Sequence, residues 1–241
     1  MTAAESSRRL LEVLRLGRTP YGEAYRLQKE LLDKRIAGEI RDTLILTEHE
    51  PVITLGRGSA PGDVSGIDVP IVEVERGGEA TYHGPGQVVA YPIFELPDGR
   101  RDVHRYMRDL EEVVIRMLAE VEVEGRRRPG HTGVWIGDLK VCSIGIAVRR
   151  WVAWHGFALN VHTDSADFAG FRPCGLEPEV MTRVADHAPL PPANILFEVL
   201  AVKHFLDVFG LELPPPPERP SGTDGTDDPG GRFPPLPILP S

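Results

Sequence analysis

The clearest periodic pattern of apolar side chains lies between residues 102 and 123. The apolar residues of this stretch recur every three or four positions: Val103, Tyr106, Met107, Leu110, Val114, Met117, Leu118 and Val121. This spacing predicts an amphipathic helix. Asp102 is suited to cap its first turn, and Gly125 lies just past its expected end.

Two further helices are expected from the same kind of pattern. Pro20 marks the start of the first, in which Leu27, Leu31 and Ile36 follow at helical spacing. The second spans residues 194–209 and ends at a glycine. The three helices lie far apart along the chain, so each must pack against segments that come from elsewhere in the sequence.

Short apolar segments between the helices predict strands. They span residues 10–16, 43–47, 52–55, 71–74, 87–95, 134–136, 141–148 and 152–161. Residues 56–66 are rich in Gly, Pro, Ser and Asp, which predicts a loop. Several strands follow one another without a helix between them. This arrangement indicates an α/β class with a mixed sheet.

The composition changes near residue 210. Ten of the residues in 211–241 are proline, with Gly and Asp between them. Such a segment buries too little apolar surface to offset its ordering entropy. The expected organisation is one folded domain at 1–210 and a proline-rich, disordered tail at 211–241. No apolar run approaches the roughly 20 residues that cross a bilayer, so the expected location is the cytoplasm, away from membranes.

The charges argue against a nucleic-acid partner. The 241 residues carry a formal net charge of -9, whereas nucleic-acid binding usually needs a broad basic surface. Local clusters of arginine nevertheless offer docking sites for an acidic protein. These clusters are Arg100, Arg101, Arg105 and Arg108, then Arg126, Arg127 and Arg128, then Arg149 and Arg150.

The chain has two cysteines, Cys142 and Cys174. Two cysteines do not make a disulfide framework. They allow a single bridge or, in a cytosolic protein, one buried thiol and one reactive thiol. Cys142 falls within an apolar strand pattern and is expected to be buried. Cys174 lies between Pro173 and Gly175 in a loop, where a thiol is exposed to react.

Three other stretches carry candidate chemistry. Residues 76–87 hold four glycines and a proline, with Arg76 and His83 as polar groups; this backbone suits close approach to a ligand or a structural turn between strands. Residues 137–146 predict a turn that enters a strand, whose alternation places Lys140, Cys142 and Ile144 on one face. Residues 154–160 predict a strand in which a glycine permits close approach.

These four stretches, in this order, resemble the lipoyl(octanoyl) transferase family. The resemblance rests on the Arg-Gly-Gly…His-Gly-Pro-Gly-Gln segment, on Lys140 with the Ser-Ile-Gly after it, on the His-Gly-Phe-Ala-Leu-Asn strand and on the Pro-Cys-Gly loop. It extends from the first strand to the last helix and excludes the tail. It implies an α/β fold with a mixed sheet flanked by helices, similar to the biotin and lipoate protein ligases.

The resemblance also implies an activity. The enzyme would transfer octanoate from octanoyl-acyl carrier protein to a lysine of lipoyl domains, in 2-oxoacid dehydrogenase complexes and in the glycine cleavage H protein, with no cofactor and no metal. Cys174 would be the nucleophile and Lys140 its proton acceptor. Ile144, Phe157 and Leu159 are expected to line an acyl slot that His83 shapes. The residues implied to bind substrate are Arg76, Gly77, Gly78, Glu79, Ala80, Thr81, Tyr82, His83, Ser143, Ile144, Gly145, Gly156, Phe157 and Ala158.

Four alternatives remain at this point. An ATP-dependent ligase of the same fold would activate the acid as an adenylate and need no cysteine nucleophile. A non-catalytic acyl-binding module would keep the pocket alone. A Cys–His hydrolase would use His83 or His155 as base. A metal site would combine His83, His131, His155 and Cys174, although none of these residues has the usual ligand spacing.

Overall fold

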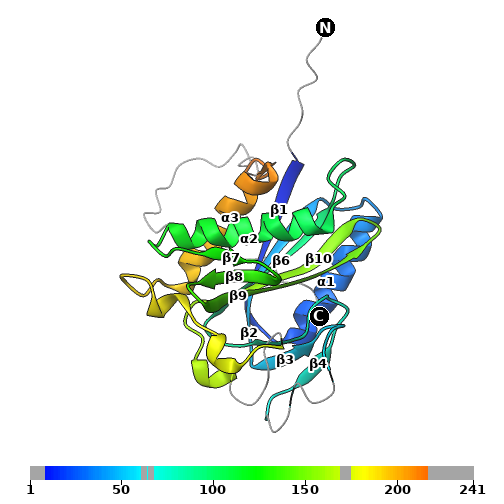
Figure 1. The fold of residues 1–241 in the computed structure, drawn as a ribbon. Helices are drawn as coiled ribbons and strands as arrows, with labels where there is room; N and C mark the ends of the chain where they lie inside the picture. The colour runs from blue at the N-terminus through cyan, green and yellow to red at the C-terminus, as the bar shows by residue number, and fades with distance from the viewer. Residues whose placement is uncertain (1–8, 61–63, 65–67, 169–174, 217–241) are drawn as a thin grey trace, which may run out of the picture.

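The computed structural model describes residues 9–60, 64, 68–168 and 175–216. An eight-stranded mixed sheet forms the centre of the molecule, and a three-stranded sheet lies beside it (Figure 1). In spatial order the large sheet holds β11 (Leu211–Glu212), β1 (Arg9–Thr19), β2 (Asp42–His49), β6 (Gln87–Glu95), β10 (Val152–Asn160), β9 (Leu139–Arg149), β8 (His131–Ile136) and β7 (Arg126–Arg128). The small sheet holds β4 (Ile71–Glu73), β3 (Val52–Leu55) and β5 (Ala80–His83).

Three α-helices cover the large sheet: α1 (Tyr21–Ile36), α2 (Val103–Ala119) and α3 (Asn194–Phe209). Strand β6 shows how the two faces divide. Val88 and Ala90 pack with α2 and α3 in the main core, whereas Val89 and Tyr91 pack with α1 in a second cluster. Two-residue alternation therefore gives the sheet two apolar faces, each with its own helices. The predicted α/β class is confirmed, as is the mixed sheet flanked by helices.

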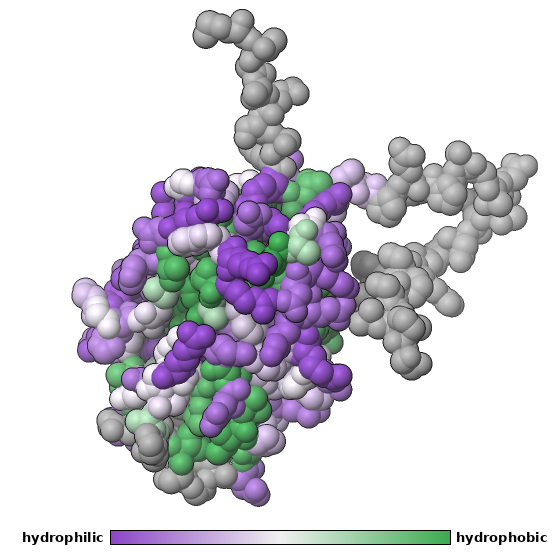
Figure 2. Space-filling view, turned by 90° about the vertical axis from the view of Figure 1, so that its right-hand side faces the viewer, coloured by the Kyte–Doolittle hydropathy of each residue, from purple (hydrophilic) through white to green (hydrophobic). Residues whose placement is uncertain are grey.

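The polar positions of the sequence face outward. Figure 2 shows hydrophilic side chains over most of the visible surface, with apolar areas between them. Between β10 and α3 the described residues form the short 3₁₀ turns η1 (Ser165–Phe168), η3 (Pro178–Val180) and η4 (Val184–Asp186). Among the described residues, no helix has both the length and the apolar character needed to cross a bilayer.

The helix boundaries follow the sequence closely, with one exception. Helix α1 starts after Pro20, and α3 ends at Gly210 in the left-handed conformation. Asp102 caps α2, because its side chain accepts a hydrogen bond from the Arg105 backbone N–H at 3.0 Å. The helix ends at Ala119 rather than near residue 123. The apolar period misleads here because a tight turn, with Glu122 at φ 58°, carries the chain back onto the core.

Every predicted strand is present, and the described residues hold three further strands that escaped prediction. Strand β5 lies inside the glycine-rich stretch, where it pairs with β3. Strand β7 consists of three arginines at the edge of the sheet, so no pattern of apolar residues predicts it. Strand β11 lies past the boundary expected at residue 210 and pairs in parallel with β1. Within the loop expected at 56–66, residues 61–63 and 65–66 fall outside the described residues.

Candidate active site

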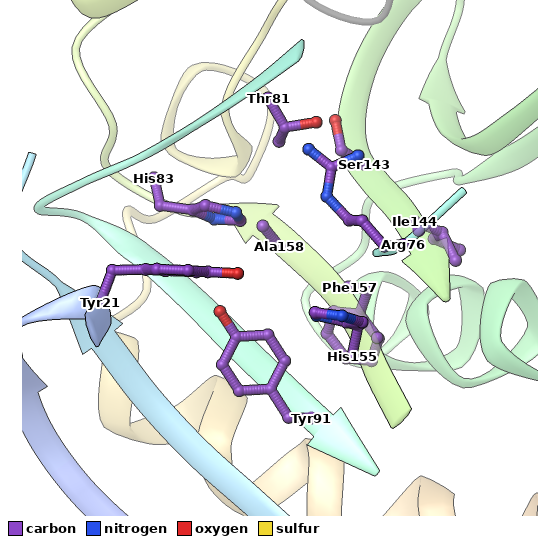
Figure 3. A pocket seen from close by; sticks show the side chains of 12 residues that line it. Tyr21, Arg76, Thr81, His83, Tyr91, Ser143, Ile144, His155, Phe157 and Ala158 are labelled. Carbon is purple, nitrogen blue, oxygen red and sulfur yellow. The ribbon is translucent and has the colours of Figure 1, made fainter. Parts of the chain in front are cut away.

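One pocket on the α1 side of the large sheet gathers the residues singled out by the sequence. It encloses about 320 Å³ of space, its open mouth included. Strands β6, β9 and β10 form its floor, and α1 and the small sheet form its walls. The side chains of Tyr21, His83 and Tyr91 point to its centre (Figure 3). It is lined by Tyr21, Arg76, Thr81, His83, Tyr91, Ser143, Ile144, Gly145, His155, Gly156, Phe157 and Ala158.

Nine of the fourteen residues expected at the substrate line this pocket. They are Arg76, Thr81, His83, Ser143, Ile144, Gly145, Gly156, Phe157 and Ala158. Ala80 and Tyr82 point the other way into a separate core cluster, because successive residues of β5 face opposite sides. Gly77, Gly78 and Glu79 form the loop behind the wall and do not line the pocket. Leu159, expected in the acyl slot, instead packs in the main core.

Arg76 is buried and holds the glycine-rich loop in shape. Its guanidinium donates to the carbonyl oxygens of Gly77 (3.1 Å), Glu79 (2.8 Å) and Thr54 (2.9 Å) and to the Thr54 hydroxyl (2.8 Å). The loop leaves no space for a side chain at Gly56, where a Cβ atom would lie 2.3 Å from the Gly78 carbonyl oxygen. The glycines of this stretch thus allow the backbone to wrap a buried positive charge.

Tyr21, Tyr91 and His155 line the pocket although the sequence analysis did not place them there, and His49, which it also missed, contacts the Tyr91 hydroxyl. His49 is fully buried; its Nδ1 lies 2.8 Å from the Thr19 carbonyl oxygen and its Nε2 lies 2.8 Å from the Tyr91 hydroxyl. A carbonyl only accepts, so Nδ1 carries the proton and Tyr91 donates to Nε2. Burial lowers the pKa of His49 and raises the pKa of Tyr91 well above its usual value. Both groups therefore stay uncharged.

His83 lines the pocket from β5. Its ring stacks on Tyr21, with centroids 5.8 Å apart, and its Nε2 lies 3.4 Å from the Thr54 hydroxyl. Burial lowers the pKa of His83 well below its usual value, and the nearby His49 and Arg76 lower it further. The neutral, stacked ring of His83 thus forms a fixed part of the pocket wall; its role in binding the acyl chain stays a prediction.

His155 is another lining residue that the sequence analysis did not place at the substrate. It lies within β10, is 2% exposed and takes φ 58°, a left-handed conformation that is uncommon for any residue other than glycine. Burial, followed by the positive charge of Arg76, lowers the pKa of His155 to about 3. Within the described part of the chain, its Nε2 has no hydrogen-bond partner.

Lys140 lies on a different face of β9 from the one that strict alternation predicts. Cys142 pairs with Val134 and Lys140 pairs with Trp135. The chain thus advances two residues on β9 but only one on β8, so β9 contains one extra residue at this point. This β-bulge turns Lys140 to the side of Trp135, away from Val141 and Cys142, which both pack in the main core. Lys140 is 3% exposed, so its side chain does not extend into solvent. Its Nζ sits over the Trp135 ring, 5.9 Å from the centroid.

Cys142 is buried in β9, as expected. Cys174 lies outside the described residues, but the chain that follows it runs beside Lys140. Met181 forms a parallel bridge with Lys140, and the Thr182 N–H donates to the Lys140 carbonyl oxygen at 3.0 Å. At Gly175, a Cβ atom would lie 2.4 Å from a Glu79 carboxylate oxygen. The segment after Cys174 therefore lies between Lys140 and the glycine-rich loop.

Comparison with known proteins assigns the chain to a family. The lipoyl protein ligase A/B catalytic domain profile matches residues 20–205. An octanoyltransferase from Rubrobacter xylanophilus is 46% identical over 218 residues, which cover 86% of this chain and 97% of that protein. The chain belongs to the lipoyl(octanoyl) transferase family. It is an acyltransferase.

Solved structures show that the octanoyltransferase chain shares its fold with two kinds of ligase. A bi-partite lipoate protein ligase from Thermoplasma acidophilum superposes with a TM-score of 0.67 at 18% identity, covering 86% of each chain. A biotin protein ligase from Aquifex aeolicus superposes with a TM-score of 0.51 at 11% identity, covering 83% of this chain and 70% of that one. These likenesses confirm the predicted fold.

Two of the three arginine clusters, Arg126–Arg128 and Arg149–Arg150, lie at different ends of the sheet. Arg126 on β7 pairs with Trp135, and Trp135 pairs with Lys140, so Arg126 lies two strands away, roughly 10 Å from Lys140. Arg149 lies nine positions from Lys140 along β9, a separation of roughly 30 Å. Of these two clusters, the one on β7 is the closer to Lys140.

Two of the alternatives gain no support from the geometry. Within the described residues, no group of three or more His, Cys, Asp and Glu side chains could hold a metal ion. A Cys–His hydrolase needs an imidazole that accepts a proton near neutral pH, but burial lowers the pKa of both His83 and His155. The octanoyltransferase pocket thus presents its histidines as neutral polar walls.

Proposed function

We propose that this enzyme transfers an octanoyl group from octanoyl-acyl carrier protein to a lysine of lipoyl domains, through a thioester on Cys174. The acceptors would be the lipoyl domains of 2-oxoacid dehydrogenase complexes and the glycine cleavage H protein, in the cytoplasm. The names of the curated relatives support the acyl group. The observation that carries the mechanism is the buried Lys140, set beside the segment that follows Cys174.

In the first half-reaction, the amine of Lys140 takes the proton of the Cys174 thiol. The thiolate, which is the reactive form, attacks the carbonyl carbon of the donor thioester. The bond between that carbon and the donor sulfur breaks, and the carrier thiolate leaves and recovers the proton from Lys140. One thioester replaces another, so the step needs no ATP.

In the second half-reaction, the acceptor lysine attacks the acyl group held on Cys174. Its amine must be neutral to react, and Lys140 takes the proton that is released as the carbon–nitrogen bond forms. The carbon–sulfur bond then breaks, and Cys174 leaves as a thiolate that regains the proton. The acyl chain lies meanwhile in the pocket, along β9 and β10 at Ile144, Phe157 and Ala158, whereas the Phe157 ring itself packs on Phe205 in the main core.

The test is the intact mass of the protein after incubation with octanoyl-acyl carrier protein in the absence of ATP. We expect a gain of one octanoyl group that is lost in Cys174→Ala and passes to an added lipoyl domain. Cys142→Ala is the matched control and should keep the adduct, because Cys142 packs in the core away from the pocket. Lys140→Met should form the adduct about 100-fold more slowly, which is the lower end of the range usual for loss of a general base.

Three outcomes would contradict the proposal as it stands. Modification of the lipoyl domain by free octanoate only when ATP is present would favour the ligase, with Cys174 incidental. Binding of the acyl group without any transfer would favour the non-catalytic module. An adduct that persists in Cys174→Ala and disappears in Cys142→Ala would show that Cys142, and not Cys174, is the nucleophile.

A further inference from the structure

The inner end of the pocket is polar, although an octanoyl chain ends in a methyl group. His155 Nε2 is buried without a partner among the described residues. Within the same described residues, the Tyr21 hydroxyl makes no hydrogen bond, and the Tyr91 hydroxyl uses its proton on His49 and keeps its lone pairs. Figure 3 shows that both hydroxyls point to the centre of the pocket, with the His155 ring at its side.

The strand register places this polar group far from Lys140. His155 pairs with Ile146, which is six positions beyond Lys140 on β9, a distance of roughly 20 Å. Ser143 and Gly145, which line the pocket, lie between these two levels. An extended eight-carbon acyl chain measures roughly 9 Å, since its carbon–carbon bonds of about 1.5 Å run in a zigzag. Ser143 is three positions, or roughly 10 Å, from Ile146 on β9, so a chain whose carbonyl lies beside Ser143 reaches the level of His155 with its far end.

The backbone holds His155 in a costly position. A left-handed residue inside a strand costs on the order of 1–3 kcal/mol, and such residues cluster at functional sites. Stacking keeps the ring in place, with the Trp154 ring 4.0 Å away on one side and the Tyr25 ring at 6.1 Å. At Gly156, a Cβ atom would lie 2.1 Å from the Ala90 carbonyl oxygen, so the strand cannot shift toward β6.

We propose that this end of the pocket binds a hydroxyl at the far end of the acyl chain, so that ω-hydroxyacyl thioesters are substrates. Tyr21 and His155 are then specificity-determining residues: Tyr21 donates to the hydroxyl oxygen, and the hydroxyl donates to the Tyr91 oxygen or to His155. The inference rests on the proposed acyl transfer. A hydroxyl suits the site because it both donates and accepts. The neutral state of His155, whose pKa burial lowers to about 3, leaves no imidazolium there to select an anion.

The test compares two donors of equal length, ω-hydroxyoctanoyl-acyl carrier protein and nonanoyl-acyl carrier protein, which differ only in a hydroxyl or a methyl group at the end. The readout is the ratio of their kcat/KM values. We expect the wild type to favour the hydroxy chain by about tenfold, since a methyl group would leave buried polar atoms unpaired. Octanoyl-acyl carrier protein is measured alongside.

Two variants localise the effect. Tyr21→Phe keeps the ring but removes the hydroxyl, and we expect the ratio to fall threefold or more, in line with one lost hydrogen bond. His155→Asn tolerates the left-handed backbone but its shorter amide does not reach the chain, and the ratio should fall similarly. Tyr106→Phe is the matched control: its hydroxyl is also buried without a partner in the described chain, but it lies in the core on the α2 side. Its ratio should equal that of the wild type.

The outcomes separate this inference from the proposed function. If no acyl group is transferred from any of the three donors, the proposed function fails first. If octanoate is transferred but the wild-type ratio is one or less, the hydroxyl site is wrong and the transferase stands. The hydroxyl site would also be wrong if Tyr21→Phe left the ratio unchanged, or if Tyr106→Phe lowered the ratio as much as Tyr21→Phe does. Both comparisons remain valid if His155→Asn does not fold.

Discussion

Mild acid is expected to destabilise the protein through the histidines of the pocket. The pKa of His155 lies at about 3 in the folded state, against 6.5 for the free side chain, because burial and Arg76 disfavour the imidazolium. The unfolded chain therefore binds more protons than the folded one below about pH 6.5. The stability that comes from a neutral His155 is fully present above that pH and is lost as the pH falls toward 3.

The size of the effect follows from the linkage between proton binding and folding. Each pH unit between the two pKa values costs about 1.4 kcal/mol for one group. Lowering the pH from about 7.5 to about 5.5 should thus remove about 1.4 kcal/mol through His155 alone. The pKa values of His49 and His83 are lowered too, so both residues add to the loss in the same direction. A typical domain is stable by only about 5–15 kcal/mol, so the change is large.

The assay is urea unfolding across this pH range, in the wild type and in His155→Asn. The variant lacks the titrating group, so its stability should fall by about 1.4 kcal/mol less than that of the wild type. Leu190→Asn introduces the same residue at a site that is 80% exposed and should keep the wild-type pH dependence. Equal losses on acidification in the wild type and in His155→Asn would refute the reasoning, because His155 would then not be neutral by burial.

Two further predictions concern packing and docking. Gly156→Ala should lower stability by about 3 kcal/mol in urea unfolding, because the added Cβ would lie 2.1 Å from the Ala90 carbonyl oxygen and would force β6 and β10 apart. Arg126→Glu with Arg128→Glu should raise the KM for octanoyl-acyl carrier protein several-fold at low salt and by less at high salt. Acyl carrier proteins are acidic, and these exposed arginines lie near Lys140.

Both of these predictions have matched controls. Gly22→Ala in α1 should not destabilise the protein, since no atom lies within 4 Å of the added Cβ and alanine favours a helix. Arg149→Glu with Arg150→Glu makes the same change of charge at the far end of β9. An equal rise in KM from this second pair would show that the docking site is not at β7, or that only the net charge matters.

The sequence predicted the framework of the fold because periodicity reports burial. Strand β6 was predicted with the observed bounds, and α3 likewise, since each has a buried pattern closed by a turn residue. The register of Lys140 could not be predicted. Its face depends on a β-bulge opposite Trp135, and a bulge is a property of the pairing between two strands that neither strand reveals alone.

The site was predicted where local motifs mark it and missed where only the fold assembles it. Arg76 and Ser143 lie in glycine-containing stretches that stand out in the sequence. Tyr21 and Tyr91 lie in an ordinary helix and an ordinary strand, and they meet only because α1 packs on β6. His155 stands in the motif beside Gly156, but its left-handed backbone and its unpartnered nitrogen appear only in three dimensions.

The two ends of the large sheet bear on how this protein avoids joining its neighbours. An exposed strand edge invites pairing with another chain. At one end the last strand is β11, which spans Leu211–Glu212, so an incoming strand would find room for very few backbone hydrogen bonds. At the other end the last strand is β7, whose three residues are all arginines, so a second copy would bring like charges together. The same arginines that we expect to attract an acidic carrier thus also oppose pairing of this sheet edge with a second copy of the chain.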